Sequence, residues 1–99
     1  MYGLIGKMTA VDGARDTLLT ILTESVQQMP GCLSYVVAKD PRDPDAIWIT
    51  EVWDSEADHR ASLKLPAVQT AITRAKPLIA AFGDHVVTEP VGGHGLARV

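Results

Sequence analysis

The sequence Met29-Pro30-Gly31-Cys32 separates two segments of different periodicity, and it constrains the fold more than any other feature of the chain. Residues 14–29 carry apolar side chains at spacings of three and four, the period of an amphipathic helix. Because Pro cannot donate a backbone hydrogen bond and Gly tolerates a left-handed exit, we expect this helix to end here and a strand to follow over residues 33–39. The apolar face of the helix would consist of Leu18, Leu19, Leu22, Val26 and Met29.

The patterns on either side of this segment predict further strands. Residues 2–10 read as a first strand, and Asp12 can cap the helix after it because its carboxylate accepts from exposed N–H groups. Residues 40–45 contain two prolines and predict a hairpin connection. Residues 46–53 then form the clearest strand. Side chains on a strand alternate between faces, so one face would carry Ile47, Ile49, Glu51 and Trp53.

A second helical region follows. Ser55-Glu56-Ala57-Asp58 has the form of a capping box, with Asp in place of the usual Glu or Gln, and predicts a short helix to about Lys64. Pro66 disfavours helix in the residue before it and is a good first residue for the next helix.

The end of this second region is predicted from another apolar stripe. Pro77 lies inside the stripe, so we expect a break near Lys76, and Gly83 should stop the helix. Residues 85–89 would form the last strand. The stripe consists of Val68, Ala71, Ile72, Ala75, Leu78, Ile79 and Phe82.

The predicted order is β-α-β-β-α-β, which is the ferredoxin-like split β-α-β plan of an α+β fold with an antiparallel sheet. Residues 1–90 would form the domain and residues 91–99 a C-terminal tail. Two helices cover one face of such a sheet, so the apolar side chains of the other face need a cover. The simplest cover is a second copy of the chain, which predicts a homodimer.

Composition excludes several classes of partner. The 99 residues carry a net charge of −3 with basic and acidic residues interspersed, so we expect no nucleic-acid partner. A run of about 18 apolar residues is absent, so no membrane span is predicted. No zinc, dinucleotide or phosphate-loop motif is present, and no metal site is expected. A single cysteine, Cys32, and the lack of a signal-peptide pattern favour the cytoplasm.

The helix exit at residues 29–32, the strand end Glu51-Val52-Trp53-Asp54 and the helix after it resemble, in their order and spacing, the antibiotic biosynthesis monooxygenase family. That family is the cofactor-independent branch of the dimeric α+β barrel superfamily and includes quinol monooxygenases. The resemblance implies that two sheets pair as a dimeric α+β barrel. It also implies a monooxygenase that needs no cofactor and takes a small phenolic or quinol-type aromatic substrate together with molecular oxygen.

The resemblance and the residue types together suggest a site. Trp53 would form a wall of the substrate cavity, and His59, with an ordinary pKa of about 6.5, would transfer a proton. Arg74 would stabilise an oxyanion if Pro66 does not deflect the helix. Ser62 and Tyr35 complete the residues expected at the substrate. The alternatives are a core tryptophan, a surface histidine and a solvated arginine, with Tyr35 in the core or an interface. Glu51 is expected to form a hydrogen bond at the dimer interface.

Two other functions remain open. The histidines that many family members carry further along this helix are replaced here by Ser62 and Ala67. This thin polar set favours a non-oxidative ligand-binding protein or another enzyme on the same scaffold. A related haem-degrading branch has a histidine about ten residues after its strand tryptophan and a polar amide near the N-terminus. Here that position is Leu63 and the chain contains no Asn, which argues against haem chemistry.

Overall fold

The computed structural model describes residues 1–24 and 29–96, which form a four-stranded antiparallel sheet and three α-helices. The strand order is β2-β3-β1-β4. This order is that of the ferredoxin-like plan, so the predicted α+β fold is confirmed. The elements are β1 (Tyr2–Ala10), α1 (Arg15–Glu24), β2 (Cys32–Lys39), β3 (Ala46–Trp53), α2 (Glu56–Ser62), α3 (Pro66–Ala75), the 3-10 turn η1 (Lys76–Leu78) and β4 (Ile79–Thr88).

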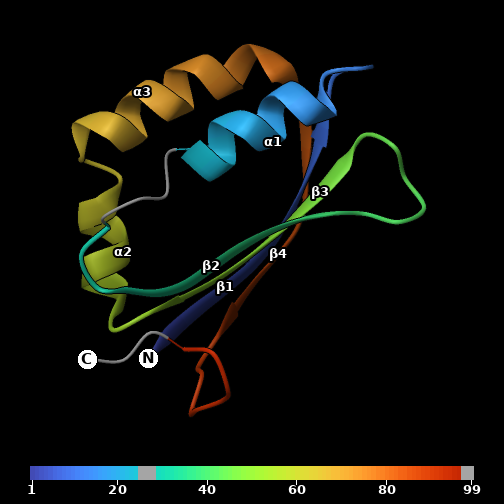
Figure 1. Ribbon diagram of the computed structural model, residues 1–99. Coiled ribbons are helices and arrows are strands. Elements are labelled where there is room, and N and C mark those ends of the chain that lie inside the picture. Colours follow the sequence, from blue (N-terminus) through green and yellow to red (C-terminus); the bar gives the residue numbers. More distant parts are fainter. Residues whose placement is uncertain (25–28, 97–99) are drawn as a thin grey trace.

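The helices all lie on one side of the sheet, with α1 and α3 packed beside each other and α2 at one end (Figure 1). Alternation along β3 directs Ile47 and Ile49 toward these helices, where Leu18 of α1 meets them. Burying such side chains is the main source of stability for the layer. No helix in the described part of the chain is long and apolar enough to cross a membrane. The buried cluster consists of Ala10, Leu18, Ile21, Ile47, Ile49 and Ala75.

The hairpin between β2 and β3 lies at the predicted residues and is tied to α1. The Asp40 carboxylate accepts from the backbone N–H groups of Arg42 and Asp43 at 2.8 and 3.0 Å, which closes the turn. The Arg15 guanidinium donates to the carbonyl oxygens of Asp43 at 2.9 Å and of Ala46 at 3.3 Å. The start of α1 is therefore fixed to the end of the sheet.

The start of the first helix differs from the prediction. It begins at Arg15, and the N–H of Leu18 bonds to the carbonyl of Ala14, so Ala14 stands at the cap position and the prediction for Asp12 is wrong. Val26 falls outside the described residues. Met29 is not helical but leads into a turn.

That turn depends on Gly31. Its φ is +81°, and a Cβ there would lie 2.5 Å from the carboxyl carbon of Asp58 on α2. Its carbonyl also accepts from the Asp54 N–H at 2.8 Å. A side chain at this position would therefore be strained and would push away the helix that carries His59.

The second helical region starts as predicted. The Ser55 hydroxyl accepts from the Asp58 N–H at 3.1 Å and caps α2. Leu65 is extended and Pro66 is the first residue of α3. The short segment between the two helices lets them run in clearly different directions (Figure 1).

The predicted break near Lys76 is confirmed, but the predicted helix stop at Gly83 and the predicted start of the last strand at residue 85 are wrong. The helix ends at Ala75, η1 contains Pro77, and β4 already begins at Ile79. Ile79 pairs with Ala10 and Phe82 pairs with Met8, so these residues form a strand beside β1 and not a helix. Unpaired backbone groups along β1 would be costly, and this pairing outweighs the helical period of the side chains.

The sheet face away from the helices carries a row of three apolar side chains and one threonine. Ile5 of β1 pairs with Thr50 of β3 and Val86 of β4, and Thr50 pairs with Val36 of β2. Val36 is 54% exposed and Val86 49%. We call the four residues Ile5, Val36, Thr50 and Val86 the open-face row.

Candidate active site

A cavity of about 340 Å³ lies between the helix-covered face of the sheet and the helices α2 and α3. Small-molecule sites typically have roughly 300–1,000 Å³, are mostly apolar and contain a few placed polar groups. The cavity fits that description at the small end. Its apolar lining includes Met8, Leu22, Met29, Val68, Ile72 and Phe82.

Three side chains form the polar end of this cavity. The indole N–H of Trp53 donates to Oε1 of Glu51 at 3.0 Å. Nε2 of His59 lies 3.9 Å from the same oxygen, and the imidazole and carboxylate side chains are 20% and 17% exposed. The His59 ring also meets the Trp53 ring edge-on, with 5.4 Å between centroids. A carboxylate, an imidazole and an indole therefore share one partly buried site.

Local structure explains why these three residues meet. Glu51 and Trp53 are two residues apart on β3 and point to the same face. Ser55 starts α2 immediately after the strand, and the His59 N–H bonds to the Ser55 carbonyl at 3.3 Å. One helical turn then places His59 above the end of β3, where the ring of Tyr2 lies 5.7 Å from it.

The environment perturbs two acids at this end. Burial raises the pKa of Glu51, although the Trp53 hydrogen bond and the neighbouring His59 partly offset the effect. Burial, with the Glu51 charge as a second cause, also raises the pKa of Tyr35, which pairs directly with Glu51 across β2 and β3. Tyr35 therefore stays neutral beside a carboxylate that holds protons more tightly than an exposed one.

The structure brings four of the five predicted site residues together. Trp53, His59, Ser62 and Tyr35 all line the cavity. Ser62 is buried, and its hydroxyl donates to the carbonyl of His59 at 2.6 Å. The Ser62 hydroxyl therefore donates its hydrogen bond within α2. Ser62 forms part of the cavity wall and stabilises the helical turn that carries His59.

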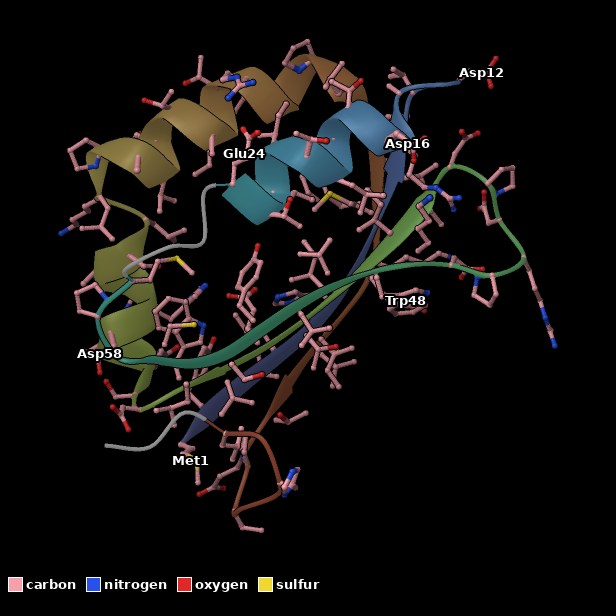
Figure 2. The ribbon with its side chains drawn as sticks, in the orientation of Figure 1. Met1, Asp12, Asp16, Glu24, Trp48 and Asp58 are labelled. Atoms are coloured by element: carbon pink, nitrogen blue, oxygen red, sulfur yellow. The ribbon has the colours of Figure 1, made fainter. Side chains whose placement is uncertain are left out.

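Arg74 does not join them. It is absent from the cavity lining, and its guanidinium lies 4.0 Å from the carboxylate of Glu24, with both side chains more than half exposed. Glu24, its partner, is the last residue of α1 and lies on the side of that helix that faces α3 (Figure 2). The expected oxyanion role required a continuous helical region, and the change of direction at Pro66 removes it.

Two lining residues were missed or misplaced by the sequence. Glu51 was expected at the dimer interface, but it faces the cavity; its shared strand face with Trp53 was the available signal. Lys76 lines the opposite end of the cavity, where α3 gives way to η1. Its place follows from the early end of α3, which the apolar stripe concealed.

Trp53 lines the cavity as expected, and its indole N–H has a partner within the protein. It is 1% exposed and its N–H is already bonded to Glu51. Trp53 therefore presents its ring as an apolar wall and orients the carboxylate.

Comparison with known proteins agrees with this architecture. The profile of the family described as Antibiotic biosynthesis monooxygenase matches residues 1–74. No protein with a curated function matches the chain. A crystal structure of a protein from Chloroflexus aurantiacus J-10-fl, provisionally named an antibiotic biosynthesis monooxygenase, is 66% identical with a TM-score of 0.94; the match covers 96% of this chain and 97% of that one.

More distant structures share the fold. A provisionally named antibiotic biosynthesis monooxygenase from Deinococcus radiodurans is 28% identical with a TM-score of 0.77, over 94% of this chain and 95% of that one. SnoaB, described as a cofactor-independent oxygenase from Streptomyces nogalater, is 14% identical with a TM-score of 0.78 over the same shares of the two chains. From the family match and the 66% identity, this chain belongs to the antibiotic biosynthesis monooxygenase family.

Proposed function

We propose that the protein is a cofactor-independent monooxygenase that oxidises a phenolic or quinol-type aromatic substrate with molecular oxygen. The observation that carries the proposal is the apolar cavity of about 340 Å³ whose polar end holds Glu51, His59 and the indole of Trp53. Family membership supports it, and SnoaB provides an example of a cofactor-independent oxygenase on this fold.

The reaction requires a site of this kind. Ground-state oxygen is a triplet and reacts slowly with closed-shell molecules. An electron-rich phenol can donate one electron to oxygen once it has lost its hydroxyl proton. The protein must therefore supply a proton acceptor, an apolar place for the ring and a donor for the oxyanion.

The described residues can supply these parts. The substrate ring lies along the apolar lining with Trp53 as one wall, and its hydroxyl faces His59 at the polar end. Tyr35 and Ser62 complete the wall there. Because Arg74 lies outside the cavity, the cationic role at the substrate passes in this proposal to Lys76, which can meet a second polar group at the far end.

Oxygen uptake tests the proposal. Purified protein is mixed with a panel of hydroquinones and anthrone-type phenols, and uptake is corrected for autoxidation. We expect protein-dependent uptake that falls about a hundredfold in His59→Ala, which removes both a proton acceptor and a hydrogen-bond donor. The matched control is Glu56→Gln on the exposed side of the same helix, which should keep full uptake. Uptake no faster than autoxidation across the panel would contradict the proposal.

A non-oxidative role on the same scaffold is the second candidate. The specific observation in its favour is that Arg74 lies outside the cavity and the Ser62 hydroxyl is bonded to α2, which leaves a small polar set. A non-oxidative role predicts saturable binding of aromatic ligands without oxygen uptake, measured by quenching of Trp53 fluorescence in the Trp48→Phe variant.

We further propose that a second copy covers the open-face row and forms the homodimer with paired sheets. The exposed side chains of Val36 and Val86 in this row support this, because contiguous exposed apolar side chains can mark an interface. Analytical ultracentrifugation should show a dimer for the wild type and a monomer for Val86→Asp. A monomeric wild type at micromolar concentration would refute the arrangement.

Two smaller assignments are also proposals. Residues 1–90 would form the domain, and residues 91–99 would be a C-terminal tail outside it. A chain ending after Pro90 should then keep its thermal unfolding midpoint. Cytoplasmic location would be tested by cell fractionation; the single cysteine, Cys32, is its support.

A further inference from the structure

Glu51 is the one acidic side chain among the cavity-lining residues that the structure describes. Carboxylates are rarely placed in such surroundings unless they are paired or have a function. In the sheet, Glu51 pairs with Leu4 of β1 on one side and with Tyr35 of β2 on the other. Its backbone position is therefore fixed from both sides, and its side chain points into the cavity.

The contacts of Glu51 fix its orientation but do not saturate it. The buried indole of Trp53 donates to Oε1 at 3.0 Å. An ionised carboxylate has about four acceptor sites on two oxygens. The group can therefore accept a further hydrogen bond from a donor that enters the cavity, and a phenolic hydroxyl is such a donor.

We propose that Glu51 is the catalytic residue that accepts the proton of the substrate hydroxyl, while His59 donates a hydrogen bond from beside it to the oxyanion that forms. In this step the substrate O–H bond breaks and an O–H bond forms on the Glu51 carboxylate. The bonding electron pair stays on the substrate oxygen as a phenolate. Electron transfer to molecular oxygen comes later. The inference rests on the proposed function.

Charge balance in the cavity favours Glu51 over His59 as the acceptor. If Glu51 takes the proton, one negative charge moves from the carboxylate to the substrate and the number of charged groups in the cavity is unchanged. If His59 takes it, an imidazolium and a phenolate must both form beside a carboxylate that is already charged. Creating two charges in a mostly apolar cavity is expensive.

The surroundings of Glu51 also bring its proton affinity closer to that of a phenol. Burial raises the pKa of Glu51, whereas a phenol ordinarily has a pKa of about 10. A smaller difference between the two makes the transfer easier. His59 with its Nε2 near Oε1 then lies close to where the phenolate oxygen would form.

Any pH dependence must be assigned against the other groups around Glu51. These are His59 of α2, His85 of β4, Lys76 of η1, and Tyr35 and Cys32 of β2. Burial raises the pKa of both Tyr35 and Cys32, so these two stay neutral near pH 7. His85→Gln is therefore the control that separates a nearby titration from that of Glu51.

Infrared difference spectroscopy tests the proton transfer directly. The probe is 4-nitrophenol, added at a pH at which the free molecule is neutral. We expect bound nitrophenolate absorption together with a new C=O band from a protonated carboxyl group. Both should vanish in Glu51→Gln. The carboxyl band should persist in His59→Gln and in the Glu56→Gln control.

Glu51→Gln is a suitable variant because its amide oxygen can still accept from Trp53, which keeps the local packing. Oxygen uptake by this variant should fall about a hundredfold, and its thermal unfolding midpoint should stay near that of the wild type. Glu51→Asp should recover part of the uptake but not the full rate. A purely structural role for Glu51 would predict the reverse, lost stability with retained turnover per folded molecule.

Several results would overturn the inference. One is nitrophenolate formation without a carboxyl band, accompanied by imidazolium bands that vanish in His59→Gln. Another is oxygen uptake by Glu51→Gln within threefold of the wild type. If the wild type takes up oxygen and either of these results is found, the proposed monooxygenase activity is retained and the role of Glu51 as its base is rejected. If the wild type takes up no oxygen, both the monooxygenase activity and the role of Glu51 are rejected.

Discussion

The two tryptophans of β3 lie on opposite faces of the same strand and make the same kind of bond in different surroundings. Trp53 is 1% exposed beneath α2 and donates to Glu51 at 3.0 Å. Trp48 is partly exposed on the face away from the helices (Figure 2) and donates to Asp40 at 2.9 Å. Lys7 lies over the Trp48 ring, 5.5 Å from its centroid.

The two carboxylates respond in opposite directions. The Trp48 hydrogen bond, with two backbone N–H donors, lowers the pKa of Asp40 to about 2. At Glu51 the same indole donor is present, but burial outweighs it and the pKa is raised. An indole–carboxylate bond is therefore a turn-stabilising contact at one end of β3 and part of the cavity lining at the other, and burial makes the difference.

The largest expected effect is on stability. Trp53→Ala should lower the free energy of unfolding by about 3–5 kcal/mol, because it leaves a cavity where the ring is fully packed. Trp48→Ala should cost less than half as much, because its ring is already partly in water. Urea unfolding at matched protein concentration measures both. Equal losses would show that the two faces are packed alike.

The next effect concerns the proposed dimer. In Trp53→Phe the remaining indole is that of Trp48 on the open face, and its emission should shift to longer wavelength as dilution separates the subunits. In Trp48→Phe the remaining indole is Trp53, and its emission should not change on dilution. Val86→Asp gives the monomer reference. A dilution response from Trp53 and none from Trp48 would place the interface elsewhere.

The pH dependence of stability should differ in sign between the two carboxylates. Asp40 has a folded pKa of about 2, below its unfolded value of 3.8. Its stabilisation is therefore present above the unfolded value and lost as the pH falls through the folded one. For Glu51 the folded pKa is raised, so its contribution is present below the unfolded value and lost as the pH rises through the folded one.

Two variants separate these contributions. Asp40→Asn should flatten the loss of stability in acid, and Glu51→Gln should remove the decline with rising pH. Thermal unfolding across an acid-to-neutral pH series measures each slope. The same slope in wild type and Glu51→Gln would mean that Glu51 titrates as it does in the unfolded chain.

The smallest effect belongs to Arg74. Its pair with Glu24 is 4.0 Å apart and exposed, so Arg74→Gln should change the free energy of unfolding by about 0–1 kcal/mol. Oxygen uptake should be unchanged, whereas Lys76→Gln should weaken substrate binding. A large loss of oxygen uptake in Arg74→Gln would show that Arg74 contributes to the reaction.

The sequence predicted most of the elements because local signals were strong. The strand over residues 46–53 has its predicted bounds, and Ser55 and Pro66 start their helices as expected. The stripe through Ile79 and Phe82 misled because its spacing suits a helix, while the open edge of β1 required a strand there. Side-chain periodicity carries no information about which backbone groups of another strand require hydrogen-bond partners.

The site was only partly predictable for a similar reason. Trp53 and His59 follow from spacing within consecutive elements, and both line the cavity. The prediction that Arg74 lies at the site was wrong, because the position of Arg74 depends on the angle between α2 and α3. The short segment before Pro66 sets that angle. Glu51 was assigned to the wrong partner, although its strand face was correctly predicted.

The sequence by itself determined the order of elements, the α+β class and the strand face shared by Glu51 and Trp53, because these depend on neighbours a few residues apart. Tertiary structure decided where β4 begins, that Arg74 lies outside the cavity and that the Trp53 N–H is bonded to Glu51. It also decided that burial raises the pKa of Glu51 while Asp40 at the other end of the strand stays strongly acidic. Burial and contact arise when distant segments pack together, so they are properties of the folded chain.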